Sequence, residues 1–186
     1  MKQINIIVGR FQPFTKGHMN CVFSAWKKFH IPTMIVMIDT PDSKVDEKHP
    51  FPSSMLLPIY NELFRDYKEI EGVILTKNAN IITIGQTLYD MGYEIKSWTC
   101  GTDRYDSYKK MSDKYKEDAH LSNDFELIEI KRSDEDISAT KVRKALLDNN
   151  YNSYINQMPF FSLRAHLKTN LYNTLRNQLL KVYEKV

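Results

Sequence analysis

Cysteines are scarce in this chain, and long apolar runs are missing. The 186 residues include two cysteines, Cys21 and Cys100, with no Cys-x-x-Cys pair and no Cys/His cluster of the kind that binds zinc. We therefore expect two buried thiols in a reducing cytoplasm. No apolar run approaches the ~20 residues that span a bilayer, and no signal peptide precedes the first strand pattern. We expect no membrane segment.

The charge balance and the motifs that are missing exclude further classes. The chain has 26 Lys and Arg, 23 Asp and Glu, a formal net charge of +3 and no arginine-rich tail. Such a mild charge favours anionic ligands slightly and predicts no nucleic-acid partner. Gly-x-Ser-x-Gly, a Walker loop and paired catalytic carboxylates are missing, which argues against a hydrolase triad, a P-loop kinase and a glycosidase.

Strand-like and helix-like segments alternate along the chain. Apolar runs and alternating patterns predict strands at residues 4–8, 33–39, 72–76, 95–100 and 125–130. Helical patterns are expected at 19–29, 57–67, 82–91, 105–116 and 140–148, with Pro58 in the first turn of the second helix. The alternation predicts a mostly parallel sheet covered by helices on both faces.

Two segments stand apart from this alternation. Residues 40–52 have no periodicity and form a long loop after the second strand, where loops border the ligand crevice in such folds. Leucines recur every three or four residues towards the C-terminus, which predicts a long amphipathic helix within residues 159–186. This helix is expected either to pack on the domain formed by residues 1–158 or to make a dimer contact in a homo-oligomer.

A strand pattern, a turn that contains Gly9 and a helical pattern follow one another near the N-terminus. Backbone N–H groups of the turn and roughly half a positive charge at the helix start favour phosphate binding. Thr15 and His18 flank Gly17 there and can direct a hydroxyl and an imidazole at one anion. Gly17 lacks a Cβ, which lets a phosphate approach the backbone. Alternatively, Thr15 only caps the helix and His18 lies at the surface.

A second anion site is expected where another helix opens after the last strand. Ser138 and Thr140 offer hydroxyls at its N-terminus, and Arg143 can reach back one turn. This set suits the β- and γ-phosphates of a nucleoside triphosphate, although an N-capped surface helix is the alternative.

A third motif lies where Gly101 ends a strand and Asp103 follows. The Asp103 carboxylate can accept both hydroxyls of a ribose, or it can merely cap a helix.

Together these segments resemble the nucleotidylyltransferase superfamily, which carries His/Thr-x-Gly-His after its first strand, Gly-x-Asp, and Ile-Ser-Ser/Ala-Thr-x-Val/Ile-Arg. The string Gly-Arg-Phe-Gln-Pro-Phe is most similar to the nicotinamide-mononucleotide adenylyltransferase branch. Thr15 stands where that branch usually has His, whereas Thr is usual in the pantetheine-phosphate and cytidylyl-transferring branches. The resemblance spans roughly residues 1–158 and implies an α/β, Rossmann-like three-layer sandwich with a central parallel sheet of about five strands.

The resemblance also implies binding residues. Residues 82–88 are similar to a Tyr-Thr-Ile-Asp-Thr-Leu stretch that borders the nicotinamide, which makes Thr83 an acceptor-binding candidate. Trp98 is a second candidate, as a stacking ring or else a core residue. The matched motifs imply that ATP contacts Gly9, Phe11, Gly17, Gly101, Asp103, Ile137, Ser138 and Thr140.

The long loop adds ambiguous candidates. Lys44 or Lys48 could swing onto the triphosphate, as a basic residue after the second strand does in several branches; Lys44 is our ATP-binding candidate, and solvated lysines are the alternative. His49-Pro50-Phe51 resembles the Asn-Pro-Phe of the mononucleotide branch, with His in place of Asn.

The implied reaction is nucleotidyl transfer, in which an acceptor phosphate attacks the α-phosphorus of ATP and pyrophosphate leaves. His18 and Thr15 would hydrogen-bond the reacting phosphate, and Arg10 and Arg143 would neutralise charge, with no covalent intermediate. Mg²⁺ would be carried by the triphosphate rather than by a carboxylate cage. Nicotinamide mononucleotide, giving NAD, is the expected acceptor. A cytidylyltransferase acting on another small phosphate and an inactive nucleotide-binding regulator are the alternatives.

Overall fold

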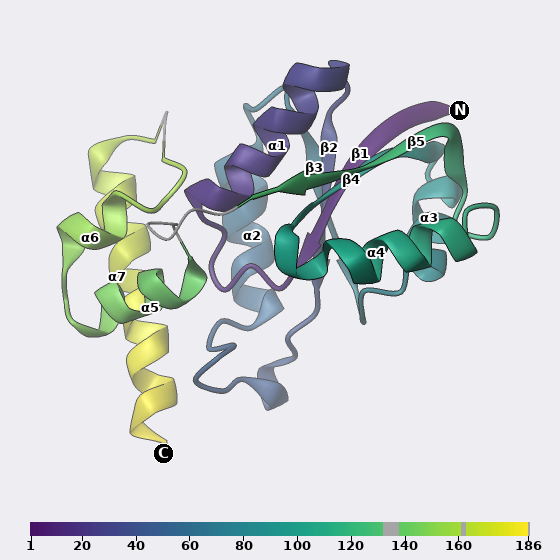
Figure 1. The fold of residues 1–186 in the computed structure, drawn as a ribbon. Helices are drawn as coiled ribbons and strands as arrows, with labels where there is room; N and C mark the ends of the chain where they lie inside the picture. Colours follow the sequence, from purple (N-terminus) through teal and green to yellow (C-terminus); the bar gives the residue numbers. More distant parts are fainter. Residues whose placement is uncertain (132–137, 161–162, 186) are drawn as a thin grey trace. The chain divides into compact units, whose positions relative to one another are not determined.

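The computed structural model describes residues 1–131, 138–160 and 163–185, and the chain forms two compact units (Figure 1). Each unit combines segments that are far apart in the sequence. The first comprises Met1–Gly9, Asn20–Ile38 and Phe64–Asp134, and the second comprises Arg10–Met19, Asp39–Leu63 and Glu135–Val186.

A five-stranded parallel sheet forms the first unit, in the order β3-β2-β1-β4-β5. Each parallel neighbour requires a crossover connection, and the strand order runs outward from β1 in both directions. The predicted α/β, Rossmann-like fold with a parallel sheet of five strands is confirmed. The strands are β1 (Lys2–Gly9), β2 (Thr33–Ile38), β3 (Ile70–Thr76), β4 (Tyr93–Gly101) and β5 (Leu121–Ile130).

Helices cover both faces of this sheet. Figure 1 shows residues 20–29 of α1 on one side of the sheet and α3 and α4 on the other. Since side chains alternate along a strand, Ile4 and Ile6 join the core cluster that also contains Leu88 and Trp98, whereas Ile7 is buried on the opposite face. The helices are α1 (Lys16–Phe29), α3 (Ile81–Asp90) and α4 (Thr102–Lys114).

One glycine sets how closely α3 approaches the segment before β5. A Cβ added at Gly85 would lie 2.0 Å from the carbonyl oxygen of Ala119, far inside van der Waals contact. Only a residue without a side chain therefore permits this packing of helix against backbone. The sequence pattern predicted the helix but gave no sign of this close approach.

The second unit is helical. Figure 1 shows α5, α6 and α7 lying together, and α7 contacts both of the others. Helix α7 buries one face, which includes Tyr172, Leu175, Leu179 and Val182. The tail is thus helical as expected, while a dimer contact through it stays a prediction. The elements are η1 (Asp42–Lys44), a short 3-10 turn, α2 (Ser53–Phe64), α5 (Ala139–Leu147), α6 (Tyr151–Ile155) and α7 (Ala165–Glu184).

The start of α2 differs from the prediction. The helix begins at Ser53 rather than at residue 57, so Pro58 lies inside it and its expected place in the first turn is wrong. Ser53 sets the earlier start, because its Oγ accepts the backbone N–H of Thr40 at 2.7 Å and its own N–H donates to the Thr40 carbonyl at 2.9 Å. Pro58 leaves one intrahelical hydrogen bond unmade.

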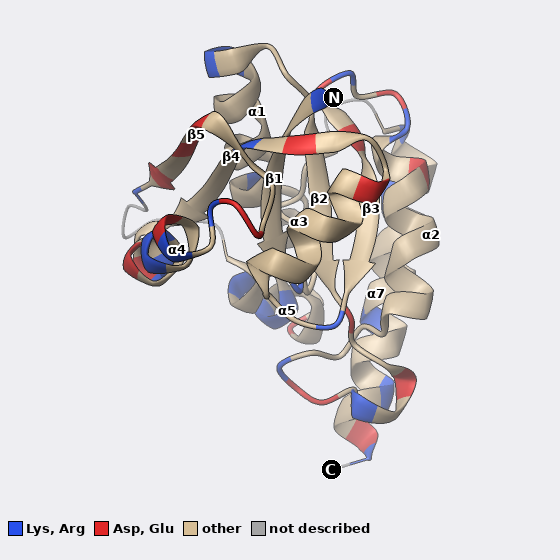
Figure 2. Ribbon diagram, turned by 90° about the vertical axis from the view of Figure 1, so that its right-hand side faces the viewer, with Lys and Arg blue, Asp and Glu red and all other residues tan. Residues whose placement is uncertain are grey.

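The surface chemistry matches the mild net charge. Figure 2 shows basic and acidic residues intermixed on α4. Helix α7 carries Lys168, Arg176 and Lys181, and its one acidic residue is Glu184 at the end. Both cysteines are free thiols; Cys100 is buried as expected, whereas Cys21 is half-buried, so the expected burial is wrong for Cys21. Within the described ranges, no helix has the length and apolar character needed to cross a membrane.

Candidate active site

A pocket of about 440 Å³ lies within the second unit, a volume typical of small-molecule sites. Four separate stretches of sequence line it: the turn after β1, the start of α1, the loop before α2 and the start of α5. The predicted residues Arg10, Phe11, His18, Thr140 and Arg143 are thereby brought together. The full lining is Arg10, Phe11, Gln12, His18, Lys48, His49, Ala139, Thr140 and Arg143.

The turn after β1 is held in an unusual backbone conformation. Phe11 has φ of 52°, in the left-handed region that non-glycine residues rarely adopt. The buried phenol of Tyr60 donates to the carbonyl of Phe11 at 2.6 Å and accepts the N–H of Phe14 at 2.9 Å. Burial raises the pKa of Tyr60, which keeps the phenol protonated as a donor. These bonds hold the turn in shape.

Gln12 joins this turn to the loop before α2. Its Nε2 donates to the carbonyl of Phe51 at 2.7 Å, and its Oε1 accepts the Phe51 N–H at 2.9 Å. Both side chains are buried, so these two bonds have little competition from water. Gln12 therefore fixes the position of the loop wall that contains Lys48 and His49.

His18 is oriented by the residue that precedes α1. The backbone N–H of Thr15 donates to His18 Nδ1 at 2.9 Å, and Thr15 Oγ1 lies 3.3 Å from the same nitrogen. Because Nδ1 accepts a hydrogen bond, the neutral ring carries its proton on Nε2. Thr15 is 1 % exposed and is not among the described lining residues, and its hydroxyl meets His18 instead.

The aromatic rings of the turn fix His18 as well. The Phe11 ring meets His18 edge-on, with centroids 4.9 Å apart, and the Phe14 ring lies 5.2 Å from it. The imidazole therefore has one defined orientation, with Nε2 as its donor nitrogen. Gly17, the half-buried residue beside it, does not belong to the described lining.

The start of α5 supplies a capped helix end and a guanidinium. Ser138 Oγ accepts the Lys141 N–H at 3.1 Å, as an N-cap does. Arg143 donates from Nη1 to the Gln12 carbonyl at 2.8 Å and from Nη2 to Thr140 Oγ1 at 3.3 Å. Partial burial lowers the pKa of Arg143 from its ordinary value, although an arginine stays charged. Ile137, predicted to contact ATP, lies outside the described residues.

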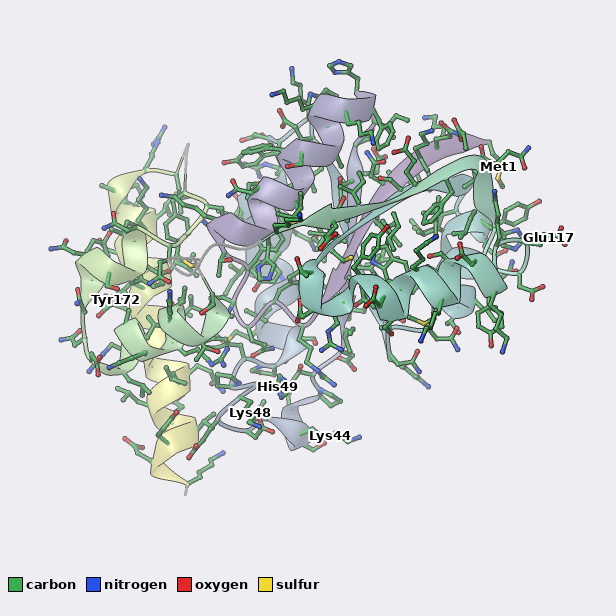
Figure 3. All side chains as sticks on the ribbon, in the orientation of Figure 1. Met1, Lys44, Lys48, His49, Glu117 and Tyr172 are labelled. Carbon is green, nitrogen blue, oxygen red and sulfur yellow. The ribbon has the colours of Figure 1, made fainter. Side chains whose placement is uncertain are left out.

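The long loop contributes Lys48 and His49 to the pocket. Figure 3 labels Lys44, Lys48 and His49, which lie along this loop. Lys44, the ATP-binding candidate, is exposed in η1 and is not among the described lining residues, whereas Lys48 lines the pocket. Asp46 Oδ1 accepts the N–H groups of Lys48 at 3.0 Å and His49 at 2.7 Å, which folds the loop into a turn.

In the part of the chain that the structure describes, the pocket lining carries positive charge and contains no acidic side chain. Arg10, Lys48 and Arg143 are cationic, and two imidazoles accompany them. Arg10 is anchored by its Nη1, which donates to the Asp39 carbonyl at 3.1 Å. The lining therefore suits a ligand with several negative charges, such as a polyphosphate.

The remaining predicted residues belong to the first unit. Gly9 ends β1, Gly101 ends β4 and precedes α4, and Asp103 is exposed in the first turn of α4. Thr83 is exposed at the start of α3, where its N–H reaches Asn80 Oδ1 at 3.4 Å.

Trp98 is fully buried in the core of the first unit. Its ring stacks on Tyr108 with centroids 3.9 Å apart. Of its two predicted roles, its surroundings fit the core residue better than the ligand-stacking ring.

Sequence reasoning missed three residues that build the pocket. Gln12 stood inside the quoted turn motif, but nothing in its neighbours indicated the paired bonds to Phe51. His49 stood in the His-Pro-Phe stretch, whose similarity to Asn-Pro-Phe was the available signal. Tyr60 lies on α2, and a helical apolar pattern does not distinguish a phenol that bonds a distant turn from an ordinary core ring.

Comparison with known proteins places the sequence in a family. The family model of cytidylyltransferase-like proteins matches residues 6–145, which is most of the chain. A comparison with curated proteins gives no match.

Several solved structures share the fold. Nicotinic acid mononucleotide adenylyltransferase of Plasmodium falciparum, complexed with APC, is 16% identical with a TM-score of 0.52, over 93% of this chain and 98% of that chain. A protein of Vibrio parahaemolyticus described as a nicotinate-nucleotide adenylyltransferase is 14% identical with a TM-score of 0.53, over 97% and 93%. Thermotoga maritima TmcAL bound with alpha-thio ATP is 13% identical with a TM-score of 0.52, over 100% of this chain and 56% of that one. At these identities the likeness concerns the fold.

Proposed function

The chain belongs to the cytidylyltransferase-like family and is a nucleotidyltransferase, and we propose that it joins the phosphate of nicotinamide mononucleotide to the AMP part of ATP, giving NAD and pyrophosphate. The observation that carries this proposal is the pocket, which gathers Arg10, His18, Lys48, His49 and Arg143, with no acidic side chain among the lining residues that the structure describes. Such a site matches the charge of a triphosphate and of the pyrophosphate that leaves.

The reaction needs positioning and charge stabilisation more than bond-making by the protein. An oxygen of the acceptor phosphate forms a bond to the α-phosphorus of ATP, the bond from that phosphorus to the bridging oxygen breaks, and its electrons leave with pyrophosphate. The acceptor oxygen is already anionic, so no side chain has to remove a proton from it. The family fold and the cationic lining support this chemistry.

Each pocket residue has a proposed role. His18 Nε2–H donates to the reacting phosphate as charge builds on it, and Thr15 acts through His18 as a positioning residue. Arg143 and Arg10 neutralise phosphate charge, and the backbone around Phe11 seats the nucleotide. The capped start of α5 adds the partial positive charge of a helix N-terminus.

The residues of the first unit complete the proposal. Asp103 binds the ribose hydroxyls, Gly101 contacts the nucleotide, and Thr83 borders the acceptor. Both side chains are exposed at helix starts, which supports their availability to a ligand. In the loop, Lys48 replaces Lys44 as the lysine proposed to reach the triphosphate, since it lines the pocket.

Mg²⁺ fits this scheme as an ion carried by the triphosphate. Among the residues that the structure describes, no cluster of three or more His, Cys, Asp or Glu side chains is placed to hold a metal. Mg²⁺ at phosphate sites commonly binds through substrate oxygens and water with few protein ligands. When bound, the ion would neutralise part of the triphosphate charge.

The acceptor assignment rests on sequence similarity within residues 9–14 and 82–88, and on the fold shared with pyridine-mononucleotide adenylyltransferases. One observation favours a second candidate. Thr15 is the residue usual in the cytidylyl-transferring branch, so a cytidylyltransferase acting on another small phosphate is the alternative function.

Pyrophosphate release with Mg²⁺ tests both candidates. ATP and CTP are each combined with nicotinamide mononucleotide, nicotinic acid mononucleotide, phosphopantetheine and glycerol phosphate. Release with ATP and nicotinamide mononucleotide, together with NAD in the products, is the expected result. Release that requires CTP would replace the proposal by the alternative, and ATP binding without release from any pair would indicate a regulator that lacks the activity.

A further inference from the structure

His49 occupies a fixed position in the wall of the pocket. Its backbone N–H donates to Asp46 Oδ1 at 2.7 Å, its carbonyl accepts the Asp46 N–H at 3.2 Å, and its ring Nδ1 lies 3.3 Å from the same carboxylate oxygen. Two contacts fix the backbone of His49 against Asp46, and the third turns the Nδ1 side of the ring towards the carboxylate. The ring therefore has Nε2 as the nitrogen left to meet a ligand.

The loop on either side of His49 is anchored to the rest of the unit. The carbonyl of Pro50 accepts a hydrogen bond from Gln178 Nε2 of α7 at 3.0 Å. Phe51, the next residue, is paired with the amide of Gln12. Because Pro50 is bonded to α7 and Phe51 to Gln12, the fold fixes the position of His49.

Opposing charges surround the imidazole. Burial and then the positive charge of Arg10 lower the pKa of His49, with Arg143 acting in the same direction, while Asp46 opposes them. The ring is thus neutral near physiological pH in the ligand-free pocket. The titratable and charged groups around it are Asp46 and Lys48 of its own loop, Arg10 of the turn after β1, His18 of α1 and Arg143 of α5. Tyr183 of α7 interacts with Arg143 in turn.

We propose that His49 binds a phosphate group of a polyphosphate chain and takes up a proton as it does so. The imidazolium donates from Nδ1 to Asp46 and from Nε2 to the phosphate, which uses both of its N–H groups. A bound polyphosphate offsets the charges of Arg10 and Arg143 that disfavour this proton in the empty pocket. Applied to a nucleoside triphosphate, the inference rests on the proposed function.

Proton uptake makes the affinity depend on pH with a defined sign. The pKa of His49 is lowered in the free protein and rises in the complex. Affinity is therefore highest below the pKa of the free protein, falls by up to about tenfold per pH unit as the pH rises towards the pKa of the complex, and above it no longer depends on His49. The phosphate chain itself loses protons in the same range, so the comparison is made between variants.

Calorimetry with ATP, and with inorganic tripolyphosphate as a probe without a base, measures this proton directly. Binding heats in two buffers with different ionisation enthalpies, near neutral pH, give the number of protons taken up. On binding, wild type should take up more protons than His49→Asn, with a difference of up to about one. Asp46→Asn keeps the carbonyl oxygen that accepts the loop N–H groups but loses the charge that stabilises the imidazolium, so it should take up less than wild type.

His166→Asn is the matched control, because His166 is exposed on α7 and does not line the pocket. It should behave as wild type. Equal proton uptake by wild type and His49→Asn would overturn the inference. It would also be overturned if wild type bound neither ATP nor tripolyphosphate.

The outcome is distinguishable from that of the proposed function. If NAD forms but proton uptake does not depend on His49, only the inference is wrong. If binding is linked to His49 but neither NAD nor pyrophosphate forms, only the proposed function is wrong.

Discussion

Replacing Gln12 by Ala tests whether one buried amide builds the pocket wall. The side chain is buried and makes two short bonds to the backbone of Phe51, which is itself fully buried. Truncation leaves an N–H and a carbonyl without these partners. Each such group costs about 1–3 kcal/mol, so the free energy of unfolding should fall by about 2–6 kcal/mol.

The same truncation should weaken nucleotide binding more than it slows the reaction. Lys48 and His49 would lose the anchor that orders them, and ordering each side chain on binding costs about 0.5–1.5 kcal/mol. We expect KM for ATP to rise roughly tenfold, which corresponds to about 1.4 kcal/mol. The turnover number should change less, because the contacts that orient His18 come from Thr15 and Phe11 instead.

Urea unfolding followed by circular dichroism, together with steady-state kinetics, measures both effects. Gln86→Ala is the matched control, because Gln86 is exposed on α3 and its bonds to Asp90 and His120 face solvent. It should stay within about 0.5 kcal/mol of wild type. If Gln12→Ala unfolds at the same urea concentration as this control, the argument that Gln12 holds the wall is refuted.

Three further changes probe the site and the fold. His18→Ala should lower the turnover number at least ~100-fold, as loss of other charge-stabilising donors does, with an unchanged circular dichroism spectrum; near-full activity would exclude His18 from the mechanism. Arg143→Lys keeps the charge but loses the planar two-sided hydrogen bonding, so KM for ATP should rise roughly tenfold, and an unaltered KM would contradict the assigned role. Gly85→Ala should destabilise the fold by at least about 2 kcal/mol in thermal or urea unfolding, because the new Cβ meets the Ala119 carbonyl at 2.0 Å. Gly72→Ala, whose Cβ would meet only a methionine sulfur at 3.7 Å, is its control, and equal stability of the two variants would refute the packing argument.

The strands and most helices were predictable because their signals are local. The runs at residues 4–8 and 33–39 are mostly apolar, as strands buried on both faces are, and both appear as inner strands of the sheet. The outer-strand pattern at 125–130 corresponds to β5 at the sheet edge. The sequence did not predict helix α6, because five residues show no clear period. It also did not predict the early start of α2, because Ser53 is bonded to Thr40, a distant loop residue.

The pocket could be predicted only in part, because motifs identify residue types and not their partners. Arg10, His18, Thr140 and Arg143 lay in recognisable strings, and the structure gathers them in one lining. The contact from Arg143 to the Gln12 carbonyl joins residues 131 positions apart, which no local pattern encodes. The same limit applies to His49. Its neighbours in the sequence pointed to the residue, but they did not indicate that it lies beside the arginines.

The position of Thr15 changes what its identity implies about substrate. In the sequence alone, Thr in place of His distinguishes the acceptor branches. In the structure Thr15 is 1 % exposed, and its N–H and hydroxyl both meet Nδ1 of His18. A change at this position therefore acts first on the orientation and tautomer of His18, which serve any nucleotidyl transfer. Discrimination among acceptors has to come from side chains with exposed polar atoms, and Thr83 is the candidate that meets this condition.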